Sequence, residues 1–386
     1  LGGIVVDLTG LNKIGEIENS VISVESGVVW KDLMEHLEGS EWMLPCYPSS
    51  ALGSTVGGWA ATGGLGYGSL KYGSFVDNVE WAKVVLPSGE ILKIESGKED
   101  EPTLRQIFGS EGILCIFGEL GIRLVKRGEA EIPFIAYFNK SIECVRAANE
   151  IVGKTRPFTL VVKSSAFLRA SHAEEVESGT IMYGLYEGPS TEVEKSIKVF
   201  RETVEKHGGM IGDEEMARHE WDERFYPLKI KKWGPTVITS DVLLPIDELE
   251  SFVIHAWSLG RKLKVDVDLE IIYTSPSEAI SFPLFLTDER KLSYMGHLTV
   301  AKKLIDYAIK HGGKSYGYGL WNSVHLGKSE PDRKKELERL KRMLDPNNVL
   351  NPGKTIKMSS KLGISLPRPL YSMFLEALWI MRRVVS

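Results

Sequence analysis

The sequence has few cysteines, no excess of basic residues and no long apolar run, and each of these absences excludes a class of protein. Its three cysteines, Cys46, Cys115 and Cys144, are far apart, which leaves no CxxC motif, no iron–sulfur run and no evident disulfide framework. The formal charge is -5 from 47 basic and 52 acidic residues, so a strongly cationic nucleic-acid binder is excluded as the default. No apolar run reaches the roughly 18 residues that a transmembrane helix needs.

The rest of the composition is that of an ordinary globular protein. Hydrophobic residues make up 43% and charged residues 26%, and 386 residues predict two or three domains of ~150 residues each. Without a signal-peptide pattern or a disulfide framework, we expect a reduced, cytoplasmic protein. Because Leu1 is not Met and residues 4–8 read as a strand in mid-fold, we expect that a further lobe precedes Leu1 in the native chain.

Hydrophobic periodicity divides the chain near residue 128. Before it, short β-rich runs between Gly, Asn, Pro and Ser predict strands over 4–8, 21–24, 80–86, 91–94 and 113–124, with helices over 29–37 and 104–108. After it, alternating patterns predict strands over 134–138, 159–164, 180–186, 236–244 and 264–273 and helices over 141–152, 191–207, 246–259 and 298–310. This rhythm is typical of an α+β domain with helices on one side of a sheet, and no internal repeat is visible.

The most informative stretch is glycine-rich and covers residues 45–73. Seven glycines fall between 53 and 68, where backbone without Cβ atoms can approach a flat or charged ligand. The spacing Gly64-x-Gly66-x-Gly68 is wrong for a Rossmann fingerprint, and Ala308 stands where a P-loop ending in Gly313-Lys314-Ser315 needs its first glycine. A plain flexible loop is the alternative, but the β-rich flanks and a second glycine site at Gly109–Gly112 favour a ligand platform.

Three segments together resemble the vanillyl-alcohol-oxidase-type FAD-linked oxidases, in the branch of the glycolate oxidase large subunit and D-lactate dehydrogenase. They are residues 48–73, the GSEGIL run of 109–114 and the LDPNNVLNPGK run of 344–354. The resemblance implies a two-part FAD-binding fold of the PCMH type, with its first lobe missing upstream, and a ferredoxin-like α+β cap. It implies an FAD-binding domain over 1–128, a cap over 129–330, a return to the FAD domain over 331–358 and a linker with an apolar tail helix over 359–386.

The resemblance also implies which residues hold non-covalent FAD. It places the diphosphate and the flavin edge at Pro48, Ser49, Thr55, Val56, Gly57 and Gly58, and the isoalloxazine and ribityl region at Thr62, Gly63, Gly64 and Gly66. It places the adenosine half at Glu111, Gly112, Ile113 and Ile116, and the chain-end segment contributes Asn351 and Lys354. The histidine-rich metal motif of the lactate and glycolate group is absent, so we expect no metal site.

Two segments are candidates for the chemistry. Arg224 follows Trp221 in a run that can face the pocket in related enzymes, where its planar fork suits a substrate carboxylate; a surface helix with salt bridges is the alternative. An aromatic and polar cluster on a glycine-rich loop stands where the family keeps active-site residues, with filling of a domain interface as the alternative: Tyr316, Tyr318, Trp321, Asn322 and His325.

The resemblance therefore predicts an FAD-dependent dehydrogenase acting on a 2-hydroxy acid or a related alcohol. Electrons would pass to a separate acceptor, an iron–sulfur partner or a membrane quinone, because the chain has no cysteine cluster of its own. The apolar run 370–381, followed by Arg382 and Arg383, is the expected contact; it could dock on a partner, lie on the inner membrane face, or pack on its own domain. A non-catalytic assembly subunit, an alkylglycerone-phosphate-synthase-like activity and a sugar-lactone oxidase remain alternatives, as does a homo-oligomer.

Overall fold

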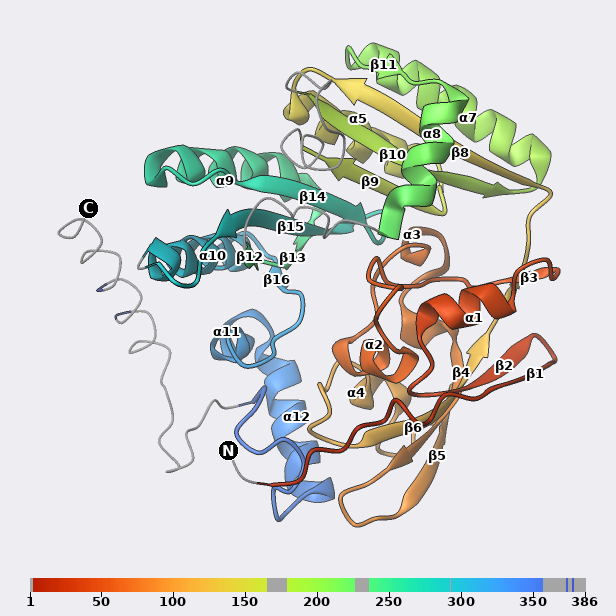
Figure 1. Cartoon of the computed structure of the whole chain (residues 1–386), viewed down its shortest axis with the longest axis vertical. Coiled ribbons are helices and arrows are strands. Elements are labelled where there is room, and N and C mark those ends of the chain that lie inside the picture. The colour runs from red at the N-terminus through yellow and green to blue at the C-terminus, as the bar shows by residue number, and fades with distance from the viewer. Residues whose placement is uncertain are drawn as a thin grey trace. The chain divides into compact units, whose positions relative to one another are not determined.

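The chain forms two compact units. The computed structural model describes residues 3–164, 179–225, 236–291 and 293–356, together with Met373 and Ala377. The chain up to Arg127 and the segment that begins at Gly317 form unit 1, and Gly128–Tyr316 form unit 2 (Figure 1). Residues 317–330 thus group with unit 1, whereas the sequence predicts them in the cap domain.

Unit 1 is built on a five-stranded antiparallel sheet. Its order is β1-β2-β6-β4-β5, from β1 (Ile14–Glu18), β2 (Val21–Glu25), β4 (Val79–Val85), β5 (Ile91–Glu95) and β6 (Ile116–Arg123). The strand predicted over 4–8 does not form: Ile4 and Val5 are 93% and 95% exposed, and no strand among the described residues covers this apolar run.

Short helices and a small ribbon complete unit 1. They are α1 (Trp30–His36), β3 (Trp42–Met43), α2 (Val56–Thr62), α3 (Ser69–Tyr72), α4 (Leu104–Ile107), β7 (Val125–Lys126), α11 (Ser323–Ser329) and α12 (Pro331–Leu344). Helix α2 lies inside the glycine-rich stretch and packs against β2 and β6. The platform predicted from the glycines is therefore partly helical.

Unit 2 contains the same β-α-β-β-α-β motif twice. The first copy is β8 (Ala130–Phe138), α5 (Ser141–Lys154), β9 (Thr159–Lys163), β10 (Thr180–Gly188), α7 (Ser190–Lys206) and β11 (Met210–Ile211). The second is β13 (Val242–Pro245), α9 (Leu249–Leu263), β14 (Asp268–Tyr273), β15 (Glu278–Thr287), α10 (Ser293–Lys310) and β16 (Lys314–Ser315). The order β11-β8-β10-β9-β14-β15-β13-β16 joins them through β9 and β14, which confirms the predicted α+β class.

The two faces of this sheet differ in their cover. Helix α5 packs against α7 and α9, and α9 against α10, so these four helices form one layer (Figure 1). The opposite face carries α8 (Glu214–Asp222), which packs on β8 and β10. All nine residues of β10 are buried because helices cover both of its faces. On this second face, Lys163 of β9 reaches Glu220 of α8.

The strand predicted over 236–244 is broken in the middle. It forms β12 (Thr236–Thr239) and β13, both paired with β15, and the backbone between them holds Ser240 and Asp241. The break lies in a sheet of otherwise regular register, which makes these two residues candidates for a role other than packing.

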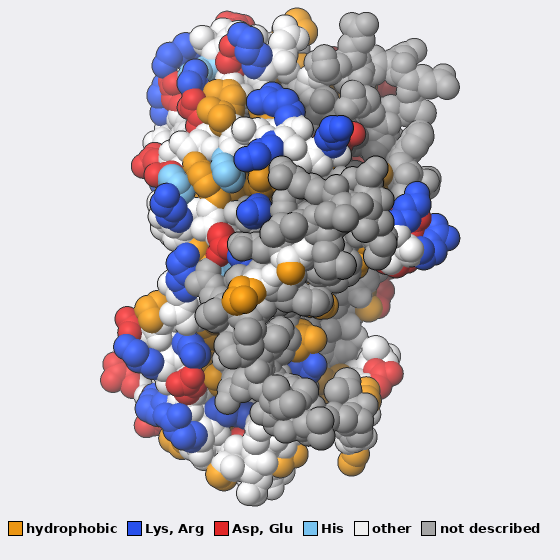
Figure 2. Space-filling model, turned by 90° about the vertical axis from the view of Figure 1, so that its left-hand side faces the viewer, with side chains coloured by type: hydrophobic (Ala, Val, Ile, Leu, Met, Phe, Trp, Pro, Cys, Tyr) orange, Lys and Arg blue, Asp and Glu red, His pale blue; other side chains and the backbone are white. Residues whose placement is uncertain are grey.

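Basic and acidic side chains are interspersed on the described part of the face that Figure 2 presents. Among the described residues, no helix is both long and apolar enough to cross a membrane. The predicted tail helix, within residues 359–386, lies outside the described residues apart from Met373 and Ala377.

Candidate flavin and substrate sites

The first turn of α2 is fixed by hydrogen bonds within unit 1. The N–H of Val56 donates to the carbonyl of Val28 (2.9 Å) and that of Gly57 to the carbonyl of Ser26 (2.8 Å). Thr55 caps the helix, since its Oγ1 accepts the N–H of Gly58 at 3.2 Å. The glycine-rich platform is therefore a rigid structure held to the neighbouring chain.

The glycines of the platform serve two different purposes. A Cβ at Gly57 or Gly64 would overlap the Cβ of Ser26 or Phe75, and one at Gly66 would lie 2.5 Å from the Tyr47 carbonyl oxygen. These three glycines are required by the protein's own packing. The other two are less crowded: a Cβ at Gly58, which is exposed, would lie 2.9 Å from Thr55 Oγ1, and one at Gly63 would lie 3.7 Å from the Cα of Gly109, an ordinary contact.

The GSEG loop lies directly against this platform. The N–H of Gly109 donates to the carbonyl of Ala60 (3.1 Å) and that of Glu111 to the carbonyl of Ala61 (2.8 Å). Ser110 is fully buried, and its Oγ has no hydrogen-bond partner within the described part of the chain. A buried hydroxyl of this kind is costly unless something pairs with it, so it points to a ligand at this loop.

The chain-end segment reaches the same loop through Glu111. The carboxylate of Glu111 accepts the N–H groups of Tyr318 and Gly319, both at 2.6 Å, and the hydroxyl of Thr355 at 3.1 Å. Asn351 Nδ2 donates to the carbonyls of Glu111 (3.3 Å) and Gly112 (3.1 Å). The three segments that carry the resemblance therefore meet, although they are far apart in the sequence.

The other predicted flavin residues lie around this junction. Pro48 is buried and begins the turn that contains Ser49, in which the N–H of Ala51 donates to the Pro48 carbonyl at 3.2 Å. Thr62 is exposed at the end of α2, and its hydroxyl donates to the Trp59 carbonyl at 3.1 Å. Ile116 begins β6. Lys354 and Asn351 line a cavity of about 400 Å³ beside α12.

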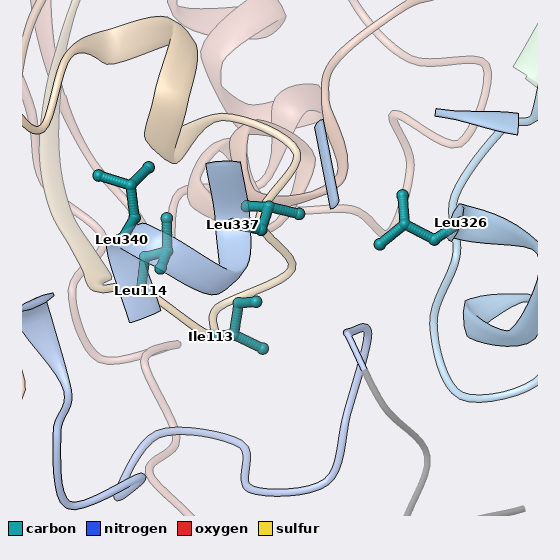
Figure 3. Close-up of a cluster of buried hydrophobic side chains, with 5 residues drawn as sticks. All are labelled: Ile113, Leu114, Leu326, Leu337 and Leu340. Carbon is teal, nitrogen blue, oxygen red and sulfur yellow. The ribbon is translucent and has the colours of Figure 1, made fainter. Parts of the chain in front are cut away.

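A hydrophobic cluster anchors α11 and α12 to the GSEG loop. Ile113 and Leu114 pack with Leu326, Leu337 and Leu340, and all five side chains are buried (Figure 3). The ring of Tyr318 packs against the same cluster. Its hydroxyl donates to Glu330 at 2.5 Å and lies 2.9 Å from Ser329 Oγ. Burial, together with the Glu330 carboxylate, raises the pKa of Tyr318 well above its usual range, so its phenol stays protonated.

The predicted aromatic cluster is divided between the two units. Tyr316 ends unit 2, where its N–H donates to the Asp241 carbonyl at 2.9 Å. The others belong to unit 1. Trp321 is 58% exposed, Asn322 Nδ2 donates to the Gly317 carbonyl at 3.3 Å, and His325 is buried in α11.

Arg224 lies between two aromatic rings of its own segment. Its guanidinium carbon is 4.1 Å from the ring centre of Trp221 and 4.2 Å from that of Phe225. Nη1 donates to the Trp221 carbonyl at 2.7 Å. Stacking and this bond hold the guanidinium beside its own backbone in the structure.

Acidic side chains on the second face of the unit 2 sheet were not predicted as site residues. Lys163 and Glu220 form an ion pair at 2.7 Å with both side chains 6% exposed, and the register places Glu270 opposite Lys163. Burial raises the pKa of Glu270; Lys163 acts against this rise. Burial, with Glu270 adding to it, raises the pKa of Asp241 to about 7. Perturbed carboxyl groups of this kind gather at functional sites.

A signal for this acidic face was present in the sequence. Asp268 and Glu270 of β14 flank the apolar Leu269, and this alternation on a strand places both acids on one face. Among the described residues, no group of three or more histidine, cysteine or acidic side chains is arranged to hold a metal ion.

The residues around the platform fit a flat, bound cofactor such as FAD. Gly58 is exposed on the platform, the buried hydroxyl of Ser110 has no hydrogen-bond partner among the described residues, and three chain segments meet there. The structure also gives the cysteines no reactive thiolate. Cys46 and Cys115 are each 1% exposed, and burial raises the pKa of Cys115 to about 12.

Two family models match the chain along most of its length. The FAD binding domain matches residues 1–95, and the C-terminal domain of FAD linked oxidases matches residues 135–355, more than half of the chain. D-lactate dehydrogenase of Anaerostipes hadrus is 25% identical over 382 residues, covering 92% of this chain and 80% of that protein. Glycolate oxidase subunit GlcD of Bacillus subtilis is 27% identical over 393 residues, covering 95% of this chain and 82% of that one.

Solved structures with the same fold are similar at lower identity. p-Cresol methylhydroxylase with substrate bound superposes with a TM-score of 0.76 at 19% identity, covering 91% of this chain and 79% of that chain. Alkyldihydroxyacetonephosphate synthase gives a TM-score of 0.66 at 20% identity, covering 89% of this chain and 66%, less than two thirds, of that one. These likenesses show the shared fold, and the family match over residues 135–355 shows that the chain belongs to the FAD-linked oxidases.

Proposed function

We propose that the chain is an FAD-dependent dehydrogenase that oxidises the alcohol carbon of a 2-hydroxy acid or a related alcohol. The observation that carries the proposal is the junction of the glycine-rich platform, the GSEG loop and the Asn351 segment, held by the Glu111 and Asn351 hydrogen bonds. The relatives named D-lactate dehydrogenase and glycolate oxidase, similar over more than nine tenths of this chain, support the substrate class.

The chain's own residues would bind and orient the cofactor and the substrate. FAD, when bound, supplies the acceptor for a hydride from the alcohol carbon. Gly58, which is exposed, and Gly63 are proposed to lie against the cofactor, and Ser110 offers a buried hydroxyl. We assign cofactor contact to the residues predicted from the sequence around this junction, and we keep Arg224, Tyr316, Trp321, Asn322 and His325 as proposed substrate-side residues.

We propose that the cofactor is held without a covalent bond. The high pKa of Cys115 and the burial of Cys46 support this, because a flavin linkage through sulfur needs a reachable thiolate. The electron acceptor is proposed to be a separate iron–sulfur protein or a membrane quinone that meets the tail, which would place the chain in the cytoplasm at the inner membrane face.

The test of the proposed function is anaerobic reduction of the purified protein. D-lactate, L-lactate, glycolate and glycerate are added in turn, and the flavin band near roughly 450 nm is followed. Bleaching by at least one of them, with a rate that saturates with concentration, is the expected result. A colourless, fully folded full-length protein that takes up no added FAD would favour the assembly-subunit alternative and overturn the proposal.

Tyr318→Phe is expected to lower the thermal midpoint while FAD stays bound. The substitution removes the donor to the Glu330 carboxylate and leaves a partly buried charge less well paired, a loss of about 1–3 kcal/mol. The measurement is a thermal melt with the flavin-to-protein ratio and the rate of flavin reduction beside it. A slower reduction in addition would support the predicted catalytic role of Tyr318, and an unchanged rate would remove it from the mechanism.

A further inference from the structure

A row of polar and aromatic side chains crosses the second face of the unit 2 sheet. The register places Lys163 opposite Glu270 and Glu270 opposite Phe282. The constant register of β15 with β12 and β13 places Asp241 opposite Phe282, and the N–H of Tyr316 binds the Asp241 carbonyl. Directly opposed residues of antiparallel strands share a face, so these side chains lie next to one another.

Two carboxyl oxygens in this row have no hydrogen-bond partner within the described part of the chain. Glu270 is 4% exposed, and its Oε1 accepts no hydrogen bond from any residue that the structure describes. Asp241 is only partly buried as a residue. Its Oδ1, however, is shielded from solvent and accepts no hydrogen bond from a described residue. Leaving such oxygens unpaired is costly, which indicates that a ligand supplies the missing donors.

Part of the row is accessible and carries aromatic rings. Helix α8 covers this face over β8 and β10, while Asp241, Phe282 and Tyr316 remain partly exposed. The rings of Phe282 and Tyr316 meet edge to face with centroids 6.4 Å apart. Carboxyl oxygens beside aromatic rings suit a ligand that combines hydroxyl groups with a carbon skeleton.

The charges in the row argue against other ligands. Lys163 already forms an ion pair with Glu220, so this cation is not available to a ligand anion. A ligand carboxylate in the row would instead lie beside the acids Glu270 and Asp241, which disfavours an anionic group there. The raised pKa values of these two acids favour their neutral forms, which gain little from a ligand ammonium group. A hydroxyl group can donate to a carboxylate and can also accept from a carboxylic acid.

We propose that this row binds the hydroxyl groups of a polyhydroxylated, sugar-derived substrate, with Asp241 and Glu270 as hydrogen-bonding partners and Phe282 and Tyr316 against its carbon skeleton. The proposal rests on the proposed function, since it names the class of alcohol that the same enzyme takes. It distinguishes this chain from an enzyme for lactate or glycolate, each of which has a single hydroxyl group.

The test is a binding series of acids that each carry one carboxylate and an increasing number of hydroxyl groups. Isothermal titration of the FAD-loaded protein compares glycolate, D-glycerate and D-gluconate, with ethanolamine as the ammonium probe. Each further hydroxyl group that forms a hydrogen bond with Asp241 or Glu270 strengthens binding by about three- to tenfold, so the affinity is expected to rise from glycolate to gluconate. Asp241→Asn and Glu270→Gln should each lose about three- to tenfold for gluconate and little for glycolate.

Asp266→Asn is the matched control. It removes an exposed acid just before β14 and should bind gluconate like the unmodified protein. The thermal midpoint of each variant without ligand shows that it is folded. Equal affinity for glycolate and gluconate, tighter binding of ethanolamine, or unchanged gluconate binding by both variants would each overturn the proposal.

The experiments distinguish an error in the proposed ligand row from an error in the proposed dehydrogenase activity. Bleaching of the flavin by lactate or glycolate, with both variants equally active, contradicts the row alone. Binding of gluconate that both variants lose, in a protein whose flavin no alcohol reduces, contradicts the dehydrogenase proposal alone.

Discussion

Replacing Asp241 by asparagine is expected to stabilise the folded protein above neutral pH. Burial raises the pKa of Asp241 from 3.8 to about 7; the residue's own backbone N–H opposes the rise, and Glu270 adds to it. A carboxyl group whose folded pKa is raised stabilises the protein fully below its unfolded pKa, and this stability is lost as the pH rises through about 7. Asparagine has the same shape and no charge to bury, so it avoids the loss.

The expected size is about 2 kcal/mol at pH 8. Each pKa unit corresponds to about 1.4 kcal/mol, and the partial exposure of Asp241 reduces the total. In a unit of this size that is about 5 °C in thermal midpoint. The measurement compares melts of the unmodified protein, Asp241→Asn and Asp266→Asn at pH 5 and pH 8. The gain of Asp241→Asn should be larger at pH 8, and parallel pH curves for all three proteins would contradict the buried charge.

Gly57→Ala and Gly58→Ala, neighbours in the first turn of α2, are expected to fail in opposite ways. A Cβ at Gly57 overlaps the Cβ of Ser26, whose carbonyl also accepts the Gly57 N–H, so the strand-to-helix contact must open. Overpacking of this kind costs about 1–3 kcal/mol. At Gly58 the nearest atom to the new methyl is the capping Thr55 Oγ1 at 2.9 Å, which must shift, and the gain in helix propensity, up to about 1 kcal/mol, acts against this cost.

Flavin content separates the two variants. Gly58→Ala should lower the thermal midpoint of the FAD-free protein less than Gly57→Ala and lose FAD, because Gly58 is exposed on the platform and the cofactor is proposed to lie against it. Gly57→Ala should lower the thermal midpoint of the FAD-free protein, as a direct effect on folding that does not depend on FAD. The measurements are the melt of the FAD-free protein and the ratio of absorbance at roughly 450 nm to protein after reloading with FAD. Full FAD loading of Gly58→Ala would remove Gly58 from the flavin site.

Periodicity predicts the elements that bury one regular face. Helix α5 begins at Ser141 as predicted and extends two residues beyond the predicted 152, because its apolar residues repeat every three to four positions. Helix α2 was missed because glycine disfavours helices, and its start is held instead by bonds to Ser26 and Val28, distant in sequence. The break at Asp241 was missed for a similar reason, since Thr236–Pro245 has continuous β-like composition and only the pairing with β15 shows the interruption.

The two candidate sites differ in how far the sequence reveals them. The candidate flavin platform is encoded in glycine-rich segments whose order can be read directly, although which of these glycines the protein's own packing requires depends on Ser26 and Phe75. The proposed ligand row on the unit 2 sheet depends on strand order and register. Lys163 and Glu270 lie over a hundred residues apart, and only the antiparallel pairing of β9 with β14 makes them neighbours.

The doubled motif of unit 2 has a consequence for its symmetry. Two identical subunits that met edge to edge would make every contact across the shared edge twice, so a contact such as that of Lys163 with Glu270 would always have a symmetry mate. In one polypeptide each copy of the motif carries its own residues. Lys163 of the first copy and Glu270 of the second can therefore form a single charged contact at the junction of β9 and β14.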